Sequence, residues 1–476
     1  MRSTKIVATL GPSSSTPEVL ERMFLAGVDV VRLNFSHGTA ADHIKRAEMV
    51  RETCRKVDRA VGIMADLQGP KIRVGKFAEG KVLLEPGDAF ILDAGLEAPG
   101  NEERVGLDYK ELPRDVKPGD MLLLDDGRVI LEVMAVKGQE IHTVTRQGGT
   151  LSNNKGINRQ GGGLTAAALT RKDIDDIRTA AQMKVDYVAV SFPKSGADMY
   201  MARELLRAAG GHAMLIAKIE RAEAIPALED IMQACDGIMV ARGDLAVEVG
   251  DASVPALQKR MILQARQHNK LTITATQMME SMISSPLPTR AEVSDVANAV
   301  LDGTDAVMLS AESASGMYPV ETVAAMNRIC IEAEKTQPVT LDREFLDRVF
   351  QRVDQSIAMA AIFTAYHLKV KAIAALTESG STALWASRLN CGVPIYALTA
   401  QAETRYRCTL FRDVYPLMVK YVGTDREELL AEAEAVLVRA GHVKDGDLIV
   451  LTIGEPIGKS GGTNTMKIVK VGATHG

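Results

Sequence analysis

The sequence predicts an α/β protein built on a (β/α)8 barrel, with a small β domain inserted into the barrel and a separate α/β domain after it. Three observations predict this arrangement. Eight short apolar runs, each followed by polar or glycine-containing residues and a helical pattern, recur through the first two thirds of the 476 residues. A long stretch rich in turns separates the third run from the fourth. The alternation of strand and helix patterns then restarts after about residue 340.

The eight apolar runs have the length and the β-branched composition of buried strands. They cover residues 5–10, 29–35, 61–67, 185–192, 214–220, 236–244, 271–277 and 305–312. Amphipathic helical segments lie between them, such as 39–57, 254–268 and 289–301. Eight such units are the number that closes a (β/α)8, or TIM, barrel, whose active sites lie where the strands end. We therefore look for functional residues at the ends of these runs.

The long stretch between the third and fourth runs is predicted to be an inserted β-barrel domain that acts as a lid. It contains the turns EPGD, KPGD, DDGR and VKGQ between short alternating runs, a pattern typical of β-hairpins. We place the insert at 69–163 and the barrel at 1–68 and 164–340. The C-terminal domain, 341–476, has a helical stretch at 354–367 and the predicted strands VKAIAAL, VPIYAL, VYPLMV, DLIVLTI and MKIVKV.

Composition narrows the class of protein. The formal net charge of −5 comes from 61 acidic and 56 basic residues that are interleaved along the chain, so we expect no nucleic-acid partner. The five cysteines are scattered and form no metal-binding pattern, which is typical of reduced cytosolic thiols. No apolar run approaches the roughly 18 residues of a membrane span, and the N-terminus lacks a signal peptide pattern. We expect a cytoplasmic protein with no membrane partner.

Polar residues gather at the ends of the predicted strands. They are Arg32, Asn34, Ser36, His37, Asp66, Lys71, Arg73, Lys218, Glu220, Arg242, Gly243, Asp244, Thr276, Ser310 and Glu312. Glu220 and Asp244 are hard carboxylates on adjacent strands, which suits Mg²⁺. Arg32, Arg73 and Lys218 add positive charge around them. Singly, such residues are ordinary ion pairs or turn caps, but together they favour phosphoryl transfer with an anionic substrate.

Several segments resemble those of pyruvate kinases, and the resemblance covers essentially the whole chain. The segments are VRLNFSHG, DLQGPKIRVG, IAKIE, VARGDL, TATQMMESM and GTDAVMLSAES. The resemblance implies Mg²⁺-dependent transfer of the phosphoryl group of phosphoenolpyruvate to ADP, which gives pyruvate and ATP in the final step of glycolysis. It also implies a homotetramer and allosteric activation by a sugar phosphate or AMP.

The resemblance also implies roles for individual residues. Lys218, Arg73 and Thr276 correspond to catalytic residues, with Thr276 near the carbon that is protonated. Glu220 and Asp244 correspond to ligands of Mg²⁺, for which Mn²⁺ can substitute. The residues that correspond to the phosphoenolpyruvate site are Arg32, Lys218, Gly243, Asp244 and Thr276, and those of the nucleotide site are Asn34, Phe35, Ser36, His37, Arg73 and Lys155.

One position departs from the family pattern. Many pyruvate kinases hold K⁺ with side chains that match Asn34, Ser36 and Asp66, and carry a glutamate at the position of Lys71. The ammonium group of Lys71 can supply the positive charge that K⁺ otherwise provides. We therefore predict activity without added potassium, and the neighbouring Leu67 and Gln68 fit the same reading.

The C-terminal domain has a candidate effector site. The segment TESGST is a small-residue turn before a helical pattern, a type that binds phosphate but that more often only caps a helix. In the family the matching loop binds a phosphorylated effector, which implies Thr377, Ser379, Gly380, Ser381 and Thr382. The later segment GEPIGKSGGTNT is one residue short of a nucleotide-binding P-loop, so we assign its Lys459 to the effector instead.

Two other functions remain open from the residues alone. Lys218 at a strand end could form a Schiff base, as in an aldolase. The C-terminal domain could also serve a sensor that binds sugar phosphates without catalysis. The full set of Lys218, Glu220, Asp244 and Thr276 favours the phosphotransferase, because a sensor needs none of them.

Overall fold

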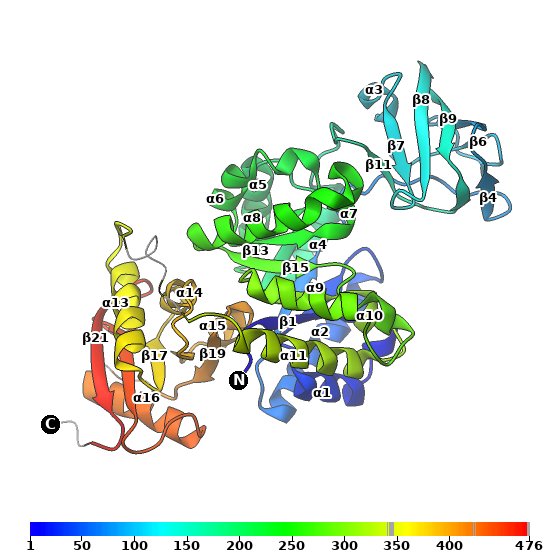
Figure 1. Ribbon diagram of the computed structural model, residues 1–476. Helices are drawn as coiled ribbons and strands as arrows, with labels where there is room; N and C mark the ends of the chain where they lie inside the picture. Colours follow the sequence, from blue (N-terminus) through cyan, green and yellow to red (C-terminus); the bar gives the residue numbers. More distant parts are fainter. Residues whose placement is uncertain (340, 342–346, 422, 424, 474–476) are drawn as a thin grey trace.

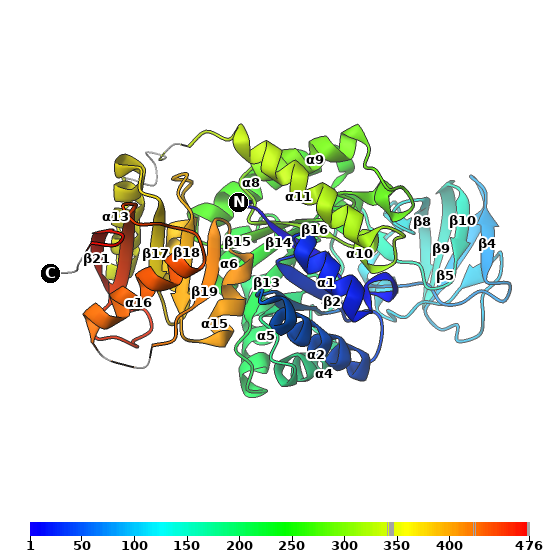
Figure 2. The same ribbon diagram turned by 90° about the horizontal axis from the view of Figure 1, so that it is seen from below.

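The computed structural model describes residues 1–339, 341, 347–421, 423 and 425–473. A barrel surrounded by helices occupies the middle of the molecule, with the inserted β domain at one end and the C-terminal α/β domain at the other (Figure 1). The view from below shows the same order, with the insert and the C-terminal sheet on opposite sides of the barrel (Figure 2).

Eight parallel strands form a closed barrel in the order β1-β16-β15-β14-β13-β12-β3-β2. The ring closes because β1 pairs with both β2 and β16. Each predicted run contains one strand, so the predicted barrel is confirmed. The strands are β1 (Lys5–Thr9), β2 (Val30–Asn34), β3 (Gly62–Asp66), β12 (Tyr187–Val190), β13 (Met214–Ile219), β14 (Gly237–Ala241), β15 (Leu271–Ala275) and β16 (Ala306–Leu309).

Helices surround the barrel. Three of them are preceded by a capping threonine, Thr39, Thr170 or Thr289. The threonine side chain accepts a hydrogen bond from the backbone amide three residues later, and the acidic side chain of that later residue accepts one from the backbone amide of the threonine. Such capping boxes satisfy amide groups that a helix start leaves free. The helices are α1 (Pro17–Ala26), α2 (Ala40–Val57), α4 (Arg171–Gln182), α5 (Gly196–Ala208), α6 (Leu228–Ala234), α7 (Arg242–Val249), α8 (Val254–Gln267), α9 (Arg290–Leu301), α10 (Ala311–Ala314) and α11 (Pro319–Lys335), with 3-10 turns η1 (Pro12–Ser14), η2 (Ala222–Ala224), η3 (Asp251–Ser253) and η4 (Glu280–Ile283).

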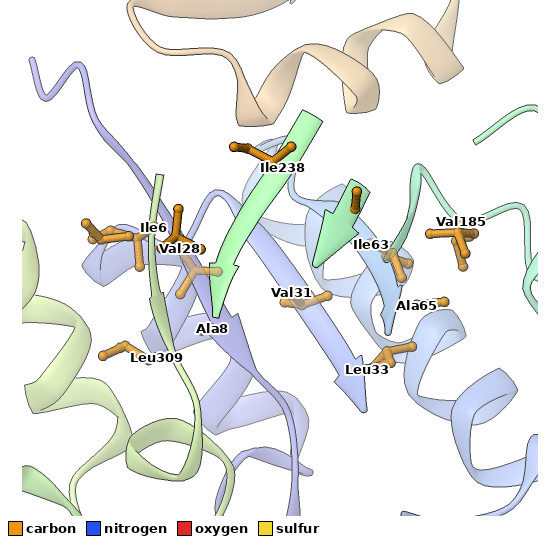
Figure 3. Close-up of a cluster of buried hydrophobic side chains, with 14 of the residues drawn as sticks. Ile6, Ala8, Val28, Val31, Leu33, Ile63, Ala65, Val185, Ile238 and Leu309 are labelled. Carbon is orange, nitrogen blue, oxygen red and sulfur yellow. The ribbon is translucent and has the colours of Figure 1, made fainter. Parts of the chain in front are cut away.

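The barrel strands are buried on both faces. One buried cluster packs between the outer face of the strands and the helices. Figure 3 shows part of this layer, with Ile6, Ala8, Val31, Leu33, Ile63 and Ala65 labelled. A second buried cluster contains the alternate residues of the strands, whose side chains point to the inner face. Val30, Met64 and Ile216 belong to it.

Charged side chains replace apolar ones at the upper end of the inner face. Because successive side chains in a strand point to opposite faces, residues two positions apart share a face. The residues two positions after Val30, Met64 and Ile216 are Arg32, Asp66 and Lys218. The alternation within β2, β3 and β13 therefore brings these charges together at the carboxyl end of the barrel.

Every predicted run extends one to three residues beyond its strand, and in three of them the extra residues bear on the site. The run 236–244 leaves the strand at Ala241, and α7 begins at Arg242. The run 271–277 ends at Ala275, because Thr276 and Gln277 have left-handed backbones with φ of 71° and 55°. The run 305–312 ends at Leu309, before the short helix α10. At the first of these ends, Gly243 and Asp244 lie in the first turn of a helix, where backbone amides lack helical partners.

The insert is a β domain with its own buried core. Its strands pair as a six-stranded sheet, β11-β7-β8-β9-β5-β6, and a two-stranded sheet, β10-β4. The predicted hairpins are present, since β7, β8 and β9 pair antiparallel in succession. The elements are β4 (Lys81–Leu84), β5 (Ala89–Asp93), β6 (Arg104–Val105), α3 (Leu112–Asp115), β7 (Met121–Leu124), β8 (Val129–Lys137), β9 (Glu140–Gln147), β10 (Gly149–Ser152) and β11 (Ile157–Arg159).

The C-terminal domain is a five-stranded sheet in the order β19-β18-β17-β20-β21, with only the last pair antiparallel. All five predicted strands are present. The elements are α13 (Val353–Leu368), β17 (Ala372–Leu376), α14 (Ser381–Ser387), β18 (Ile395–Thr399), α15 (Ala402–Arg407), η5 (Cys408–Leu410), β19 (Val414–Met418), α16 (Arg426–Arg439), β20 (Leu448–Gly454) and β21 (Thr463–Lys470). The predicted limits of the three domains remain predictions, and the boundary at 340 and 341 includes residue 340, which lies outside the described residues.

A buried ion pair joins the C-terminal domain to the foot of the barrel. Asp305, just before β16, pairs with Arg388, the residue that follows α14. Arg388 also donates to the carbonyl of Lys270, just before β15, at 2.8 Å. The foot of two barrel strands is therefore tied to the helix that follows the predicted effector loop.

Candidate active site

Four charged side chains form one network at the carboxyl end of the barrel. Lys218 Nζ lies 3.2 Å from Asp66 Oδ1 and 3.1 Å from Glu220 Oε1. Arg32 Nε lies 2.6 Å from Asp66 Oδ2. At most 12% of any of these side chains is exposed. The structure therefore brings together Arg32, Asp66, Lys218 and Glu220, as the sequence predicts.

The pKa shifts in this network keep Lys218 charged. Burial alone would lower the pKa of Lys218, but the carboxylates of Asp66 and Glu220 outweigh it, so the pKa is raised. Burial raises the pKa of Glu220, and the negative charges of Asp244 and Asp66 add to this against the opposing effect of Lys218. The charged ammonium group of Lys218 thus lies beside the carboxylate of Glu220. A further cation at this place would stabilise the ionised form of Glu220.

Glu220 and Asp244 have the chemistry of a divalent cation site. The two side chains are close enough for Asp244 to influence the pKa of Glu220. Within the described ranges, no group of three or more His, Cys, Asp or Glu side chains could hold a metal ion. Two carboxylates suit Mg²⁺, which retains water and ligand oxygens at its other positions.

Lys71 contacts Asp244 rather than the predicted monovalent-cation residues. Its Nζ lies 3.4 Å from Asp244 Oδ1. Asn34 Oδ1 instead accepts a hydrogen bond from the backbone amide of Ser36 at 3.0 Å, and Asp66 is held by Arg32 and Lys218. Lys71 therefore lies at the rim of the barrel, next to Asp244. The absence of a potassium requirement stays a prediction.

Gly243 and Thr276 contact each other directly. The backbone amide of Gly243 donates to Thr276 Oγ1 at 2.8 Å, and this hydroxyl donates to the carbonyl of Ala275 at 2.7 Å. The start of α7 and the end of β15 are therefore linked through one threonine hydroxyl.

Arg73 and Lys155 lie with the insert. Arg73 Nη1 donates to the carbonyl of Asn154 at 3.3 Å, and Arg73 forms an isolated bridge with Gly156. Lys155 Nζ lies 3.0 Å from Asp125 Oδ1. These two predicted site residues are thus neighbours of each other, and the contacts named here tie them to the insert rather than to the Lys218 network.

The predicted nucleotide segment is divided between core and surface. Phe35 is 1% exposed, and its ring stacks on His43 with centroids 4.2 Å apart. His37 is exposed, and its carbonyl contacts His43 Nε2 at 2.8 Å. The side chain of Phe35 therefore serves the core, while its backbone amide donates to the carbonyl of Asp66 at 2.9 Å and its carbonyl accepts from Lys172 Nζ at 2.8 Å.

Sequence reasoning missed two side chains that orient the network. Ser191 Oγ accepts from Lys218 Nζ at 2.9 Å and donates to the carbonyl of Leu67 at 2.6 Å. Thr9 Oγ1 accepts from Arg32 Nη1 at 3.0 Å. Both residues lie at the ends of predicted strands, the same position that identified the other members, so the signal was present in the sequence.

Four of the six predicted effector residues line a cavity of about 480 Å³ in the C-terminal domain. Its lining includes Thr377, Ser381, Thr382 and Lys459. Of the two other predicted residues, Gly380 donates its amide to Thr377 Oγ1 at 2.8 Å and Ser379 Oγ donates to Ser381 Oγ at 3.2 Å. The two separate segments are thus brought to one cavity of a size that suits a small ligand.

Two family descriptions match the chain. Residues 1–323 match the pyruvate kinase barrel domain, and residues 355–469 match the pyruvate kinase alpha/beta domain. None of the helices described in the structure is long and apolar enough to cross a membrane.

Curated relatives are similar over nearly their full length. Pyruvate kinase II of Salmonella typhimurium is 53% identical over 99% of both chains. The pyruvate kinase of Haemophilus influenzae is 54% identical over 95% of this chain and 96% of its own. That of Buchnera aphidicola from Acyrthosiphon pisum is 51% identical over 99% of both. With both domain matches and the geometry of the rim, these relatives show that the chain belongs to the pyruvate kinase family of phosphotransferases.

Proposed function

We propose that this enzyme transfers the phosphoryl group of phosphoenolpyruvate to ADP, with Mg²⁺, and releases pyruvate and ATP in the final step of glycolysis. The observation that carries the proposal is the buried ammonium group of Lys218, 3.2 Å and 3.1 Å from two carboxylates and linked through Asp66 to Arg32. A phosphoryl group in transfer spreads negative charge over its oxygens, so catalysis depends mainly on positioned positive charge.

Lys218 and Arg32 supply that positive charge at fixed positions. Both side chains are held before substrate arrives, Lys218 by Ser191 and two carboxylates and Arg32 by Asp66 and Thr9. Charges that are already oriented need no reorganisation during the reaction. Arg73 and Lys155 would add charge from the insert, on the side of the nucleotide.

Glu220 and Asp244 would hold Mg²⁺, which when bound neutralises charge on the substrate oxygens. The residues present fit the ion, because burial and a neighbouring carboxylate raise the pKa of Glu220, and a cation would offset both effects. Mn²⁺ has similar ligand preferences and could substitute.

Thr276 is proposed to serve the second step, protonation of the enolate of pyruvate. Its hydroxyl would pass a proton to the methylene carbon and recover one from solvent. The amide of Gly243, which now donates to Thr276 Oγ1 at 2.8 Å, would turn to the substrate carboxylate. Substrate binding would thereby free the threonine hydroxyl for its reaction.

The raised pKa of Lys218 argues against an aldolase. A Schiff base needs a neutral amine, whereas Asp66 and Glu220 outweigh the effect of burial and keep this amine protonated. A sensor without catalysis is also disfavoured, because its ligand site in the C-terminal domain would not require a buried ion network in the barrel.

We also propose regulation and assembly on the family pattern. A sugar phosphate or AMP would bind in the cavity lined by Thr377, Ser381, Thr382 and Lys459 and activate the enzyme. The enzyme would act as a cytoplasmic homotetramer. Light scattering of the purified protein measures the assembly directly.

The test of the reaction is pyruvate formation from phosphoenolpyruvate and ADP with titrated MgCl₂. Replacing Lys218 by methionine removes one oriented cation, and we expect the rate to fall by about 10²- to 10³-fold. The control is Lys56→Met, which removes an exposed lysine of a surface ion pair. No pyruvate from the unaltered enzyme, or trapping of a carbonyl substrate on Lys218 by borohydride, would overturn the proposal.

A further inference from the structure

Arg242 connects three elements at the barrel rim. It is the first residue of α7, and its guanidinium group pairs with both carboxylate oxygens of Asp295 in α9, at 2.6 Å and 2.8 Å. The same group donates from Nε to the carbonyl of Ala275 at 3.0 Å and from Nη2 to the carbonyl of Thr276 at 2.7 Å. Only 15% of the Arg242 side chain is exposed.

These two carbonyls define the backbone conformation of Thr276. The carbonyl of Ala275 belongs to the peptide plane before Thr276, and the carbonyl of Thr276 belongs to the plane after it. The relative orientation of the two planes sets φ and ψ of the residue between them. One guanidinium group therefore holds both planes at once.

The conformation that Arg242 holds is an unfavourable one. Thr276 has φ of 71°, in the left-handed region, where a β-branched residue is a strong outlier. Such a backbone is energetically unfavourable and persists only where surrounding contacts impose it. Without those contacts Thr276 would relax toward an extended backbone, and its hydroxyl would leave its present position.

The hydroxyl of Thr276 depends on the same contacts. Oγ1 accepts from the amide of Gly243, the residue after Arg242, and donates to the carbonyl of Ala275. The side chain of Arg242 thus donates to the carbonyl of Ala275, which is the acceptor of this hydroxyl. The amide of Gly243, which donates to the hydroxyl, belongs to the next residue in the chain.

We infer that Arg242 is a positioning residue for the protonation step, and that Asp295 holds Arg242 in the orientation this requires. The inference rests on the proposed function, because it acts through Thr276. Lysine cannot replace the arginine, since its single ammonium group cannot form a bidentate pair with a carboxylate and also reach two carbonyls in the same plane.

The test separates protonation from phosphoryl transfer in Arg242→Lys and Asp295→Asn enzymes. Because protonation is reversible, the enzyme with MgCl₂ and ATP should exchange the methyl protons of pyruvate with solvent deuterium, which NMR follows. We expect exchange to fall about 10²-fold, the usual result of a 1 Å misplacement at a reacting centre. The solvent deuterium isotope effect on pyruvate formation should rise, because protonation becomes slower than transfer, while the Kd of ADP stays within about twofold.

A matched control lies at the other end of the barrel. Arg203 Nη2 pairs with Asp236 Oδ2 at 3.1 Å, and both side chains are partly buried, but the pair is remote from Thr276 in the fold. Arg203→Lys should leave exchange and the isotope effect unchanged. If Arg242 had a purely structural role, Arg242→Lys and Asp295→Asn would lower stability without changing the isotope effect.

Rescue adds an independent measurement. In Arg242→Ala, added guanidine should restore part of the exchange rate, since the ion can occupy the same carboxylate and carbonyls. An Arg242→Lys enzyme with unchanged exchange and isotope effect overturns the positioning role alone. An unaltered enzyme that forms no pyruvate overturns the proposed function on which the inference rests.

Discussion

Lys71 Nζ lies 3.4 Å from Oδ1 of Asp244, so the position that departs from the family pattern contacts a proposed ligand of Mg²⁺. A glutamate there would instead place a third carboxylate near Asp244 and Glu220. Carboxylates that share a site raise one another's pKa and attract cations. The identity of this one residue therefore determines how much positive charge the rim contains before any ion binds.

We predict that the unaltered enzyme is fully active without potassium and that Lys71→Glu requires it. In potassium-free buffer the variant should be at least about tenfold slower, equivalent to about 1.4 kcal/mol of transition-state stabilisation, and KCl should restore its rate. Pyruvate formation across a KCl titration measures both enzymes.

The control is Lys76→Glu, an equal change of charge at an exposed lysine of the insert. It should leave the potassium response flat. An unchanged potassium-free rate in Lys71→Glu would show that the lysine does not replace the cation.

Glu248 makes stability depend on pH near neutrality. It is 6% exposed in α7, and burial raises its pKa from 4.5 to about 7. Its neighbours are the amide of Ala222, the side chain of Asn158, and the opposing charges of Glu223 and Arg221. Because the folded state holds this proton more tightly than the unfolded state, the contribution of Glu248 to stability falls as pH rises from 4.5 to about 7 and is constant above that.

We therefore predict that Glu248→Gln, which mimics the protonated form, stabilises the protein above pH 7 and has little effect near pH 4.5. Urea unfolding at pH 5, 6, 7 and 8 measures the difference. Glu204→Gln, at an exposed site, should give a difference that does not vary with pH. A constant difference for Glu248→Gln as well would refute the raised pKa.

The barrel could be predicted because its signals are local. A buried strand has a continuous apolar run, and eight runs with helices between them leave few alternatives. The period of two within a strand then predicts that Lys218 and Glu220 share one face. Because the strands of such a barrel all end at one rim, the sequence also predicts that Arg32 and Asp66 lie near Lys218.

The errors have tertiary causes. Arg242 begins α7, and its guanidinium group donates to the carbonyls of Ala275 and Thr276 at the end of the neighbouring strand β15, where Thr276 has a left-handed backbone. No local pattern in the sequence contains that contact. The partner of Lys71 is likewise more than 170 residues away in the chain. The sequence indicates the residue types at the site, but it does not indicate which distant elements lie next to them in the fold.

The effector cavity predicts a selective loss of activation. Lys459 lines the cavity with Ser381 and Thr382, and a lysine there can pair with a phosphate group. In Lys459→Ala the concentration of sugar monophosphate or AMP that gives half-maximal activation should rise at least about tenfold. The titration is made at subsaturating phosphoenolpyruvate.

Lys444→Ala removes an exposed lysine elsewhere in the same domain and should leave the activation curve in place. A flat response of the unaltered enzyme to every candidate would argue against an effector site. An unshifted curve in Lys459→Ala would place the phosphate on other residues.

The ion pair between Asp305 and Arg388 predicts a large loss of stability when one partner is neutralised. Only 2% of Asp305 and 4% of Arg388 is exposed, and Asp305 also accepts from the backbone amides of Thr272 at 2.9 Å and Arg412 at 3.0 Å. Asp305→Asn leaves the guanidinium charge buried without a counter-ion, which typically costs about 3–5 kcal/mol.

Urea unfolding of Asp305→Asn at constant pH measures this cost. The matched control is Asp175→Asn, which removes an exposed pair with Arg178 and should change stability by less than about 1 kcal/mol. Since the buried pair joins the barrel foot to α14, the variant should also lose the C-terminal domain to limited proteolysis before the barrel. Equal effects of the two substitutions would mean that water reaches Arg388 and that the interface is held by its apolar contacts instead.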